Sequence, residues 1–323
     1  KLARKKVGWI HSQFNRSLQK LENTVSIVTP YTFLFSVLNL QWSPLMRMRF
    51  DHIAHNSNLY YNQLYGGIPS TLGQLQHLNS LDLSSNSLTG SIPSSLTMLR
   101  NLEYLDLSRN DLDGTIPSNL KGLQSLRILD LTQNKLTGPI PDSIRYCQNL
   151  TVIYAYRNFL NGTINENLGT LSSLQLLGLY YNSLSGRIPK ELGKLSALQY
   201  LALDGNDLHG ELPKELGNLT NLRALYLTAN NFNGTLPTTY EHLTNLQVFA
   251  VSGNYLSGPI PAYIGKWVNL SDLVLIGNNF SGNLPAETFS LTKLEKLWVS
   301  DVNNPGISFP QEVIPEPNSL FSV

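Results

Sequence analysis

Leu78–Arg100 reads LNSLDLSSNSLTGSIPSSLTMLR, and most of the chain consists of further copies of this stretch. Within it, Asn86 is followed by a glycine four residues later and by a proline seven residues later. Asparagines recur in this setting every 24 residues, and only one repeat has another residue, Asn165, in place of the proline. The ten are Asn62, Asn86, Asn110, Asn134, Asn158, Asn182, Asn206, Asn230, Asn254 and Asn278. A fixed period of this length predicts a solenoid, in which stacked coils share one core.

Each repeat predicts one short strand with a buried face and an outward face. Leu81 and Leu83 alternate with Asp82 and Ser84, which is the period of a strand that is buried on one side. Stacked coil upon coil, ten such strands would form a parallel sheet with a spacing of about 4.8 Å between neighbours.

The asparagine follows the strand, where backbone groups lose their partners in the sheet. An amide side chain carries both donors and an acceptor, so it is expected to satisfy the loop of its own coil and of the next coil. The glycine allows a positive φ, and the proline suits the start of a short helical turn. The remaining apolar residues are expected in the core, for example Leu88, Ile92, Leu96 and Leu99.

The motif N-x-L-x-G-x-I-P after L-x-L resembles the plant-type leucine-rich repeat over about residues 59–302. The chain is similar to ectodomains of plant leucine-rich-repeat receptor-like serine/threonine kinases. Later stretches resemble the group with a malectin-like module after the repeats: Leu219–Pro237, Gly253–Trp267 and Leu294–Pro310. The resemblance implies an α/β solenoid, a leucine-rich-repeat superhelix with a concave parallel β-sheet and short 3-10 or helical turns on the convex side.

The repeat boundaries divide the chain into three parts. Residues 1–57 form an atypical N-terminal segment or degenerate cap, residues 58–302 the repeat domain, and residues 303–323 an irregular proline-rich tail. Basic KLARKK followed by apolar Val25–Leu40 resembles a signal sequence. Pro30 and Asn39 interrupt that apolar stretch, which favours a capping region or sequence outside the native domain. No segment is long and apolar enough to predict a spanning helix.

Composition limits the partners and the chemistry. Residues 1–50 carry eight Lys/Arg and one Glu, so the remainder has a net charge of −6, which argues against nucleic acid as a partner. The single cysteine, Cys147, occupies a leucine position and is predicted to be buried. The cysteine-closed first coil that the resemblance implies is missing. His52 and His55 lack further ligands nearby in sequence, so neither a metal nor another cofactor is expected.

Sequons and the family resemblance predict the secretory route. N-x-S/T occurs at Asn15 and, within the repeats, at six candidate glycosylation sites, Asn149, Asn161, Asn218, Asn233, Asn269 and Asn279. The expected location is the extracellular face of the plasma membrane or, for a secreted protein, the cell wall.

The outward positions of the predicted sheet change character along the chain. Asp82, Asp106 and Asp130 stack first, and they are interpreted as a common filling of the repeat, with an acidic contact patch as the alternative. Tyrosines and arginine follow, and these residue types dominate binding interfaces. The candidate ligand-binding residues are Tyr154, Tyr156, Arg157, Tyr180, Tyr181, Tyr200, Asp204 and Tyr226. The alternative is that tyrosine is simply a good strand residue.

Towards its end the same face becomes apolar at Val274, Ile276 and Trp298, which is suited to docking a following module. No catalytic motif is found, so this chain is not expected to be an enzyme, although a kinase domain could belong to the full-length protein. The predicted function is an extracellular domain that binds a peptide, carbohydrate or protein ligand, with a co-receptor ectodomain as a further partner. The alternative is a secreted inhibitor of a pathogen's cell-wall-degrading enzyme.

Overall fold

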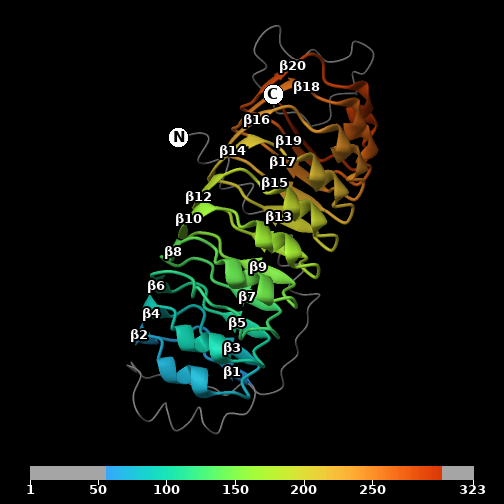
Figure 1. The fold of residues 1–323 in the computed structure, drawn as a ribbon. Coiled ribbons are helices and arrows are strands. Elements are labelled where there is room, and N and C mark those ends of the chain that lie inside the picture. Colours follow the sequence, from blue (N-terminus) through green and yellow to red (C-terminus); the bar gives the residue numbers. More distant parts are fainter. Residues whose placement is uncertain (1–55, 300–323) are drawn as a thin grey trace. The chain divides into compact units, whose positions relative to one another are not determined.

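The computed structural model describes residues 56–299, in which three-residue strands from successive repeats form one parallel sheet of eleven strands (Figure 1). Neighbours in the sheet are always consecutive repeats, so the predicted solenoid is confirmed. The strands are β1 (Asn56–Asn58), β3 (Ser80–Asp82), β5 (Tyr104–Asp106), β7 (Ile128–Asp130), β9 (Val152–Tyr154), β11 (Leu176–Gly178), β13 (Tyr200–Ala202), β15 (Ala224–Tyr226), β17 (Val248–Ala250), β19 (Asp272–Val274) and β21 (Lys296–Trp298).

The register of this sheet is one whole repeat. Leu81 of β3 pairs with Leu105 of β5, and Asp82 pairs with Asp106, so equivalent positions form columns along the stack. From β3 to β21 the central residue of each strand belongs to the hydrophobic core and its neighbours point outward, as the alternation predicts, whereas the central residue of β1 is the buried Ser57. We call the outward side of this sheet the sheet face.

The ladder asparagines are the links between coils. The amide nitrogen of Asn158 donates to the carbonyl oxygens of Leu131 at 2.9 Å and Ala155 at 3.2 Å. Its amide oxygen accepts the backbone N–H of Leu136 at 3.0 Å. Leu131 and Leu136 lie in the preceding repeat, so the amide bonds to the preceding coil. The expectation that it would bond to the next coil is wrong. The prediction that one side chain satisfies two coils is confirmed.

A second strand after each asparagine was not predicted. These strands form a three-stranded and a seven-stranded parallel sheet, here called the lateral sheets. In β4 Leu88 is buried while its neighbours Ser87 and Thr89 are exposed, so a strand alternation also follows the asparagine. The strands are β2 (Tyr65–Gly67), β4 (Ser87–Ser91), β6 (Asp111–Asp113), β8 (Thr137–Gly138), β10 (Phe159–Thr163), β12 (Ser183–Gly186), β14 (Asp207–Glu211), β16 (Asn231–Gly234), β18 (Tyr255–Pro259) and β20 (Asn279–Ser281).

Short 3-10 helices follow the prolines, which occupy the N-cap position in eight of the nine helices found among residues 56–299. Asn165 replaces the proline at the fourth helix, where its side chain accepts the N–H of Asn167 at 2.9 Å. The helices are η1 (Ser70–Gln74), η2 (Ser94–Met98), η3 (Asp142–Tyr146), η4 (Glu166–Thr170), η5 (Lys190–Lys194), η6 (Lys214–Asn218), η7 (Thr238–His242), η8 (Ala262–Lys266) and η9 (Ala286–Ser290).

The core runs through all coils as one hydrophobic cluster between the sheets and the helices. Leu88, Ile92, Leu96 and Leu99 belong to it, as predicted. Cys147 is also a buried core residue, and burial raises the pKa of its thiol to about 12, which keeps it protonated.

Several sequence-based expectations fall on residues outside 56–299. They concern the segment before residue 56 with Asn15, His52, His55 and Val25–Leu40, and the tail at residues 303–323. Within the part that the structure describes, no helix has the length and apolarity that crossing a membrane requires.

Candidate functional site

The candidate tyrosines lie on the sheet face. Ile153, Leu177 and Leu201, the central residues of three consecutive strands, belong to the hydrophobic core. Tyr154 is adjacent to the first of these and Tyr200 to the last, and neither is a member of that core cluster. The sequence prediction that these residues share one face therefore agrees with the strand geometry.

Four of the tyrosine rings contact one another across two coils. The rings of Tyr156 and Tyr180 are stacked, with centroids 4.1 Å apart and an interplanar angle of 12°. Tyr154 meets Tyr156 edge-on at 6.0 Å, and Tyr181 meets Tyr180 edge-on at 5.7 Å. The guanidinium of Arg157 lies 5.9 Å from the centroid of the Tyr181 ring. We call these four tyrosines and Arg157 the tyrosine cluster.

Exposure divides the cluster into two layers. Tyr154 and Tyr180 are only 7% and 1% exposed, whereas Tyr156 and Tyr181 are half-buried and Arg157 is exposed. Burial raises the pKa of Tyr156 and Tyr180, and the charge of Asp130 raises that of Tyr156 further. The hydroxyls therefore remain protonated at physiological pH and can donate hydrogen bonds. A ligand would meet Tyr156, Arg157 and Tyr181 first, with the other two rings as support.

Two glycines make room for the cluster, and sequence reasoning missed both. A Cβ atom on Gly178 would lie 3.1 Å from Cδ1 of Tyr154 and 3.8 Å from Cε1 of Tyr180. A Cβ atom on Gly205 would lie 2.5 Å from Cδ1 of Tyr181. A glycine inside a strand often marks a close approach, so Gly178, which lies between Leu177 and Leu179 at the end of β11, was a usable signal.

Arg157 and Tyr181 adopt a backbone conformation that side chains disfavour. Their φ angles are 55° and 54°, while Gly253 and Gly277 occupy the equivalent position in later repeats with φ of 62° and 68°. A residue with a Cβ in this region costs about 1–2 kcal/mol. Tyr61, Ser85, Arg109, Gln133 and Ala229 have φ angles of 53° to 55° at the same position, so this conformation belongs to the repeat and does not single out the pair.

Tyr200, Asp204 and Tyr226 continue the same face beyond the cluster, and Tyr226 pairs in register with Ala202. The carboxylate of Asp204 accepts the backbone N–H of Thr228 at 2.8 Å. Burial raises the pKa of Asp204 to about 7. The structure therefore spreads the eight predicted residues over four coils, and the described ring contacts concentrate in the tyrosine cluster.

The three stacked aspartates before the cluster have structural partners. A carboxylate oxygen of Asp82, Asp106 and Asp130 accepts the backbone N–H two residues later, at 3.0, 2.8 and 2.8 Å respectively. Burial, and then the charge of Asp82, raises the pKa of Asp106. These contacts support the reading of the aspartates as part of the repeat.

The six sequons of the described repeats all lie away from the sheet face. Asn161, Asn233 and Asn279 are exposed on lateral strands, and Asn218 is exposed at the end of η6. Asn149 and Asn269 lie in turns after η3 and η8, and their amide nitrogens donate to Gln124 and Thr244 at 2.9 and 3.3 Å. Glycans at these positions would leave the tyrosine cluster accessible.

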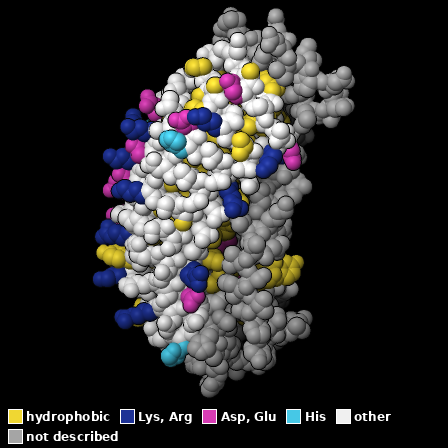
Figure 2. All heavy atoms as spheres, turned by 90° about the vertical axis from the view of Figure 1, so that its right-hand side faces the viewer, with side chains coloured by type: hydrophobic (Ala, Val, Ile, Leu, Met, Phe, Trp, Pro, Cys, Tyr) yellow, Lys and Arg dark blue, Asp and Glu magenta, His cyan; other side chains and the backbone are white. Residues whose placement is uncertain are grey.

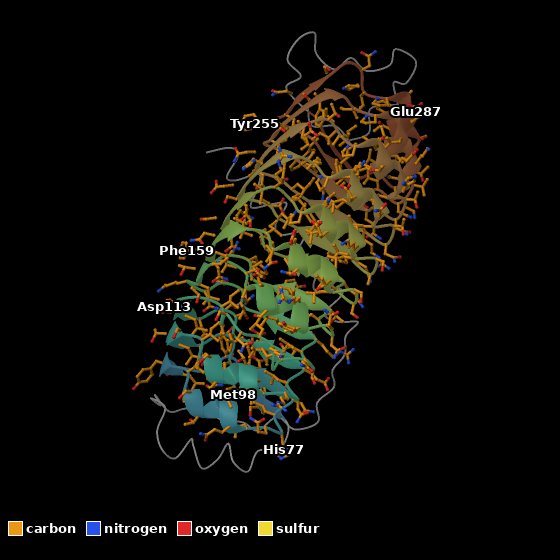
Figure 3. All side chains as sticks on the ribbon, viewed as in Figure 1. His77, Met98, Asp113, Phe159, Tyr255 and Glu287 are labelled. Carbon is orange, nitrogen blue, oxygen red and sulfur yellow. The ribbon has the colours of Figure 1, made fainter. Side chains whose placement is uncertain are left out.

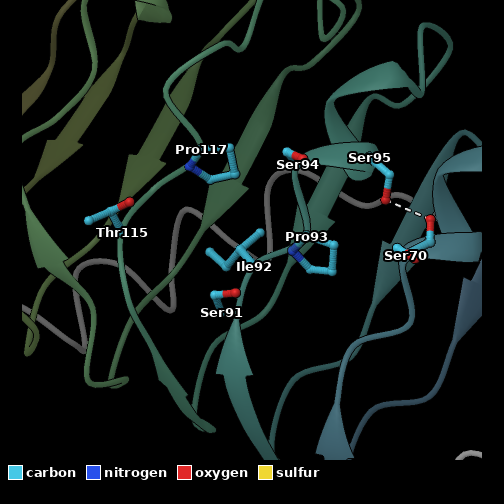
Figure 4. A pocket seen from close by; sticks show the side chains of 8 residues that line it. All are labelled: Ser70, Ser91, Ile92, Pro93, Ser94, Ser95, Thr115 and Pro117. Atoms are coloured by element: carbon cyan, nitrogen blue, oxygen red, sulfur yellow. Dashed lines mark hydrogen bonds between the residues drawn. The ribbon is translucent and has the colours of Figure 1, made fainter.

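Elsewhere on the described surface, Tyr60 and Tyr61 form a smaller aromatic pair, 50% and 78% exposed, with ring centroids 5.8 Å apart. Figure 2 shows basic and acidic side chains interleaved along one edge of the view, so charges of one sign do not gather there. A hollow between η2 and the lateral strands is lined by neutral side chains (Figure 4): Ser70, Ser91, Ile92, Pro93, Ser94, Ser95, Thr115 and Pro117. Among residues 56–299, no group of three or more potential metal-ligating side chains is found.

Family comparisons match the repeats over most of the described chain. The leucine-rich repeat region family matches residues 144–254 and 183–306, which together cover half of the 323 residues. Two further leucine-rich repeat families match residues 58–112 and 125–147. No curated protein sequence matches the chain.

Solved structures of plant receptors are similar in fold. The crystal structure of a TDR receptor is 31% identical, with a TM-score of 0.77, over 82% of this chain and 51% of that chain. The plant peptide hormone receptor RGFR1 in complex with RGF2 is 33% identical, with a TM-score of 0.69, over 75% and 43%.

The Arabidopsis receptor kinase HAESA, in complex with the peptide hormone IDA and the co-receptor SERK1, is 35% identical. Its TM-score is 0.74, over 76% of this chain and 41% of that chain. The present chain thus spans about half the length of these proteins or less. The repeat period, the asparagine links and the family matches establish that this chain belongs to the leucine-rich-repeat family, with a fold similar to plant receptor-kinase ectodomains.

Proposed function

We propose that this chain is the extracellular ligand-binding part of a plant receptor-like kinase, and that it binds a peptide on the sheet face. The observation that carries the proposal is the tyrosine cluster, which combines stacked rings, an exposed arginine and a surface free of sequons. Tyrosine and arginine supply large contact area and directional hydrogen bonds at low entropic cost.

The geometry favours an extended ligand. Accessible groups of the cluster lie on neighbouring coils, with Tyr156 and Arg157 after β9 and Tyr181 after β11. Asp204 follows after β13, so the candidate contacts form a path across the strands. A peptide laid along this path would meet aromatic surface, a positive charge and then a carboxyl group. The similar receptors RGFR1 and HAESA are both described in complex with peptide hormones.

Binding variants should separate ligand contacts from support. A library of extended peptides would be selected on the chain, and the affinity of the selected peptide measured by calorimetry. Arg157→Ala and Tyr181→Ala should each weaken binding by about 10-fold or more, the loss that accompanies about 1.4 kcal/mol at an interface.

The matched control is Tyr255→Ala, because Tyr255 is an exposed aromatic residue on lateral strand β18. It should leave the affinity unchanged. Equal affinities for the parent chain and the double variant Arg157→Ala/Tyr181→Ala, with folding intact, would exclude the sheet-face site.

The proposal extends to the arrangement of the whole protein. We place the repeat domain at residues 58–302, between the atypical segment 1–57 and the tail 303–323, on the extracellular side of the plasma membrane. We also propose that the full-length protein carries a malectin-like module and a kinase domain, and that its partner is a co-receptor ectodomain. At the end of the sheet face Ile276 and Trp298 are partly exposed and offer apolar surface to such a neighbour, whereas Val274 is buried beneath it at 3% exposure. The secreted-inhibitor alternative is not favoured, since the similar solved structures described above are receptors.

A further inference from the structure

Phe159 is a large apolar side chain that is 59% exposed on the lateral strand β10 (Figure 3). Figure 3 places it at the same edge of the ribbon as Asp113 and Tyr255, away from the core. It lies on the lateral sheet, outside the tyrosine cluster on the sheet face. The proposed ligand site therefore gives no reason for its exposure.

The same strand carries a sequon two residues later. Asn161, Gly162 and Thr163 form N-G-T, and β10 spans Phe159–Thr163. Only Leu160 of the strand is buried, and Phe159 and Asn161 are both exposed. Because side chains of a strand alternate, Phe159 and Asn161 point to the same side, about 6–7 Å apart along the strand. That separation matches the width of one sugar ring.

The surroundings of Asn161 leave room for a sugar. No hydrogen bond of its side-chain amide is found among the described residues, in contrast to Asn149 and Asn269. In the next strand its register partner is the small residue Ser183. A sugar on Asn161 would therefore meet the Phe159 ring before any other large apolar group of its own strand.

We propose that Asn161 is glycosylated and that its first N-acetylglucosamine packs on the ring of Phe159. The donor would be a lipid pyrophosphate-linked oligosaccharide of the secretory pathway. The Asn161 amide nitrogen forms a bond to the anomeric carbon, the bond from that carbon to the pyrophosphate oxygen breaks, and the amide proton passes to a base of the transferase. The apolar C–H face of the pyranose then covers the ring and removes apolar surface from water.

A second sequon of the repeat supplies a comparison. Asn233 lies three repeats after Asn161 in the same N-G-T context, on strand β16. The residue two positions before it is Asn231, which is polar, so its own strand offers no ring, but its register partner in β18 is the exposed Tyr255. The inference rests on the secretory route in the proposed function and is independent of ligand binding on the sheet face.

The test uses the 323-residue chain secreted from plant cells, with occupancy of each sequon measured by mass spectrometry. Thermal unfolding is compared for the parent, Phe159→Ala, Asn161→Gln and the double variant. The midpoint loss on removing the glycan should be larger by about 1–4 °C when Phe159 is present, since an aromatic contact of ordinary strength has that effect in a domain of this size.

Two further measurements distinguish ring contact from general stabilisation. The N-acetyl methyl proton of the Asn161 glycan should move upfield in the NMR spectrum, and Phe159→Ala should abolish that shift. The same measurement at Asn233 is the comparison: any upfield shift of a glycan there should come from Tyr255 and should not respond to Phe159→Ala. An occupied Asn161 with equal midpoint losses in both backgrounds overturns the inference alone. If no sequon of the chain is occupied, the secretory route is overturned as well. The ligand site is tested separately, because unchanged peptide affinity in Arg157→Ala/Tyr181→Ala would exclude that site alone.

Discussion

Replacing Asn158 by alanine should lower the free energy of unfolding by about 2–5 kcal/mol, although the change removes only one small side chain. The amide oxygen is the acceptor for the Leu136 N–H at 3.0 Å, so that buried donor loses its partner. Leaving one buried group unsatisfied costs about 1–3 kcal/mol. This single loss sets the lower part of the expected range.

The three carbonyl oxygens that accept from Asn158 are less affected, and the third of them, on Tyr156 at 3.5 Å, also accepts the N–H of Gln133 at 2.9 Å. Leu131 O also accepts from Asn134 at 3.2 Å, and Ala155 O also accepts from Asn182 at 3.0 Å. Each keeps one of its bonds and loses the other, worth about 0.5–1.5 kcal/mol. The overlap between successive amides therefore limits the damage from any one substitution.

Asn158→Asp provides a sharper test, because it retains the acceptor for Leu136 and replaces the donor by an oxygen facing three carbonyl oxygens. The carboxylate should be at least as destabilising as alanine at pH 7, and acidification should restore part of the loss by protonating it.

Both variants would be measured by urea unfolding with two spectroscopic probes, because a solenoid can unfold in parts. Asn231→Ala, at an exposed asparagine of lateral strand β16 that is not part of a sequon, is the control and should change stability by less than about 0.5 kcal/mol. A loss at Asn158 no greater than this control would refute the linking role of the amides.

Three further outcomes follow from the sheet face. Arg157→Gly should raise the midpoint of thermal unfolding, because it relieves a backbone φ of 55°, and it should weaken peptide binding. Ser85→Gly, at a φ of 53° in an earlier repeat, should also raise the midpoint but leave peptide binding unchanged. Gly178→Ala should displace the Tyr154 ring, which will show as a change in near-ultraviolet circular dichroism and reduced affinity without loss of the fold. Burial raises the pKa of Asp204 to about 7 from an ordinary 3.8, so the folded chain holds this proton more tightly than the unfolded chain and stability falls as pH rises from about 4 to about 7. Asp204→Asn should flatten that dependence in denaturant titrations, and an unchanged slope would contradict the assignment.

The repeat was sufficient to predict the main sheet, because its features depend on local alternation and a strict period. Leu81 and Leu105 had to align once the coils stacked, since each occupies the same place in its repeat. The lateral strands were missed because their alternation spans only three residues around a buried leucine such as Leu88. Propensity alone does not separate such a segment from a loop.

The sequence predicted on which face of the sheet the candidate residues lie, but not how their side chains pack against one another. Alternation placed Tyr154 and Tyr180 on the sheet face, but sequence spacing carries no information on which rings stack. The stacking of Tyr156 on Tyr180 depends on side-chain rotation and on the space above Gly178. The division into buried supporting rings and accessible contacts therefore required coordinates.

The backward direction of the asparagine bonds bears on how the chain is made. Asn86 accepts the N–H of Leu64 and donates to the carbonyl of Leu59, both of which the ribosome has already synthesised. Each turn can thus be clamped as soon as the following 24-residue repeat emerges, about one to five seconds later at ordinary rates of translation. Growth from the ribosome and closure of the spiral then run in the same order, so a nascent molecule exposes little more than its newest turn.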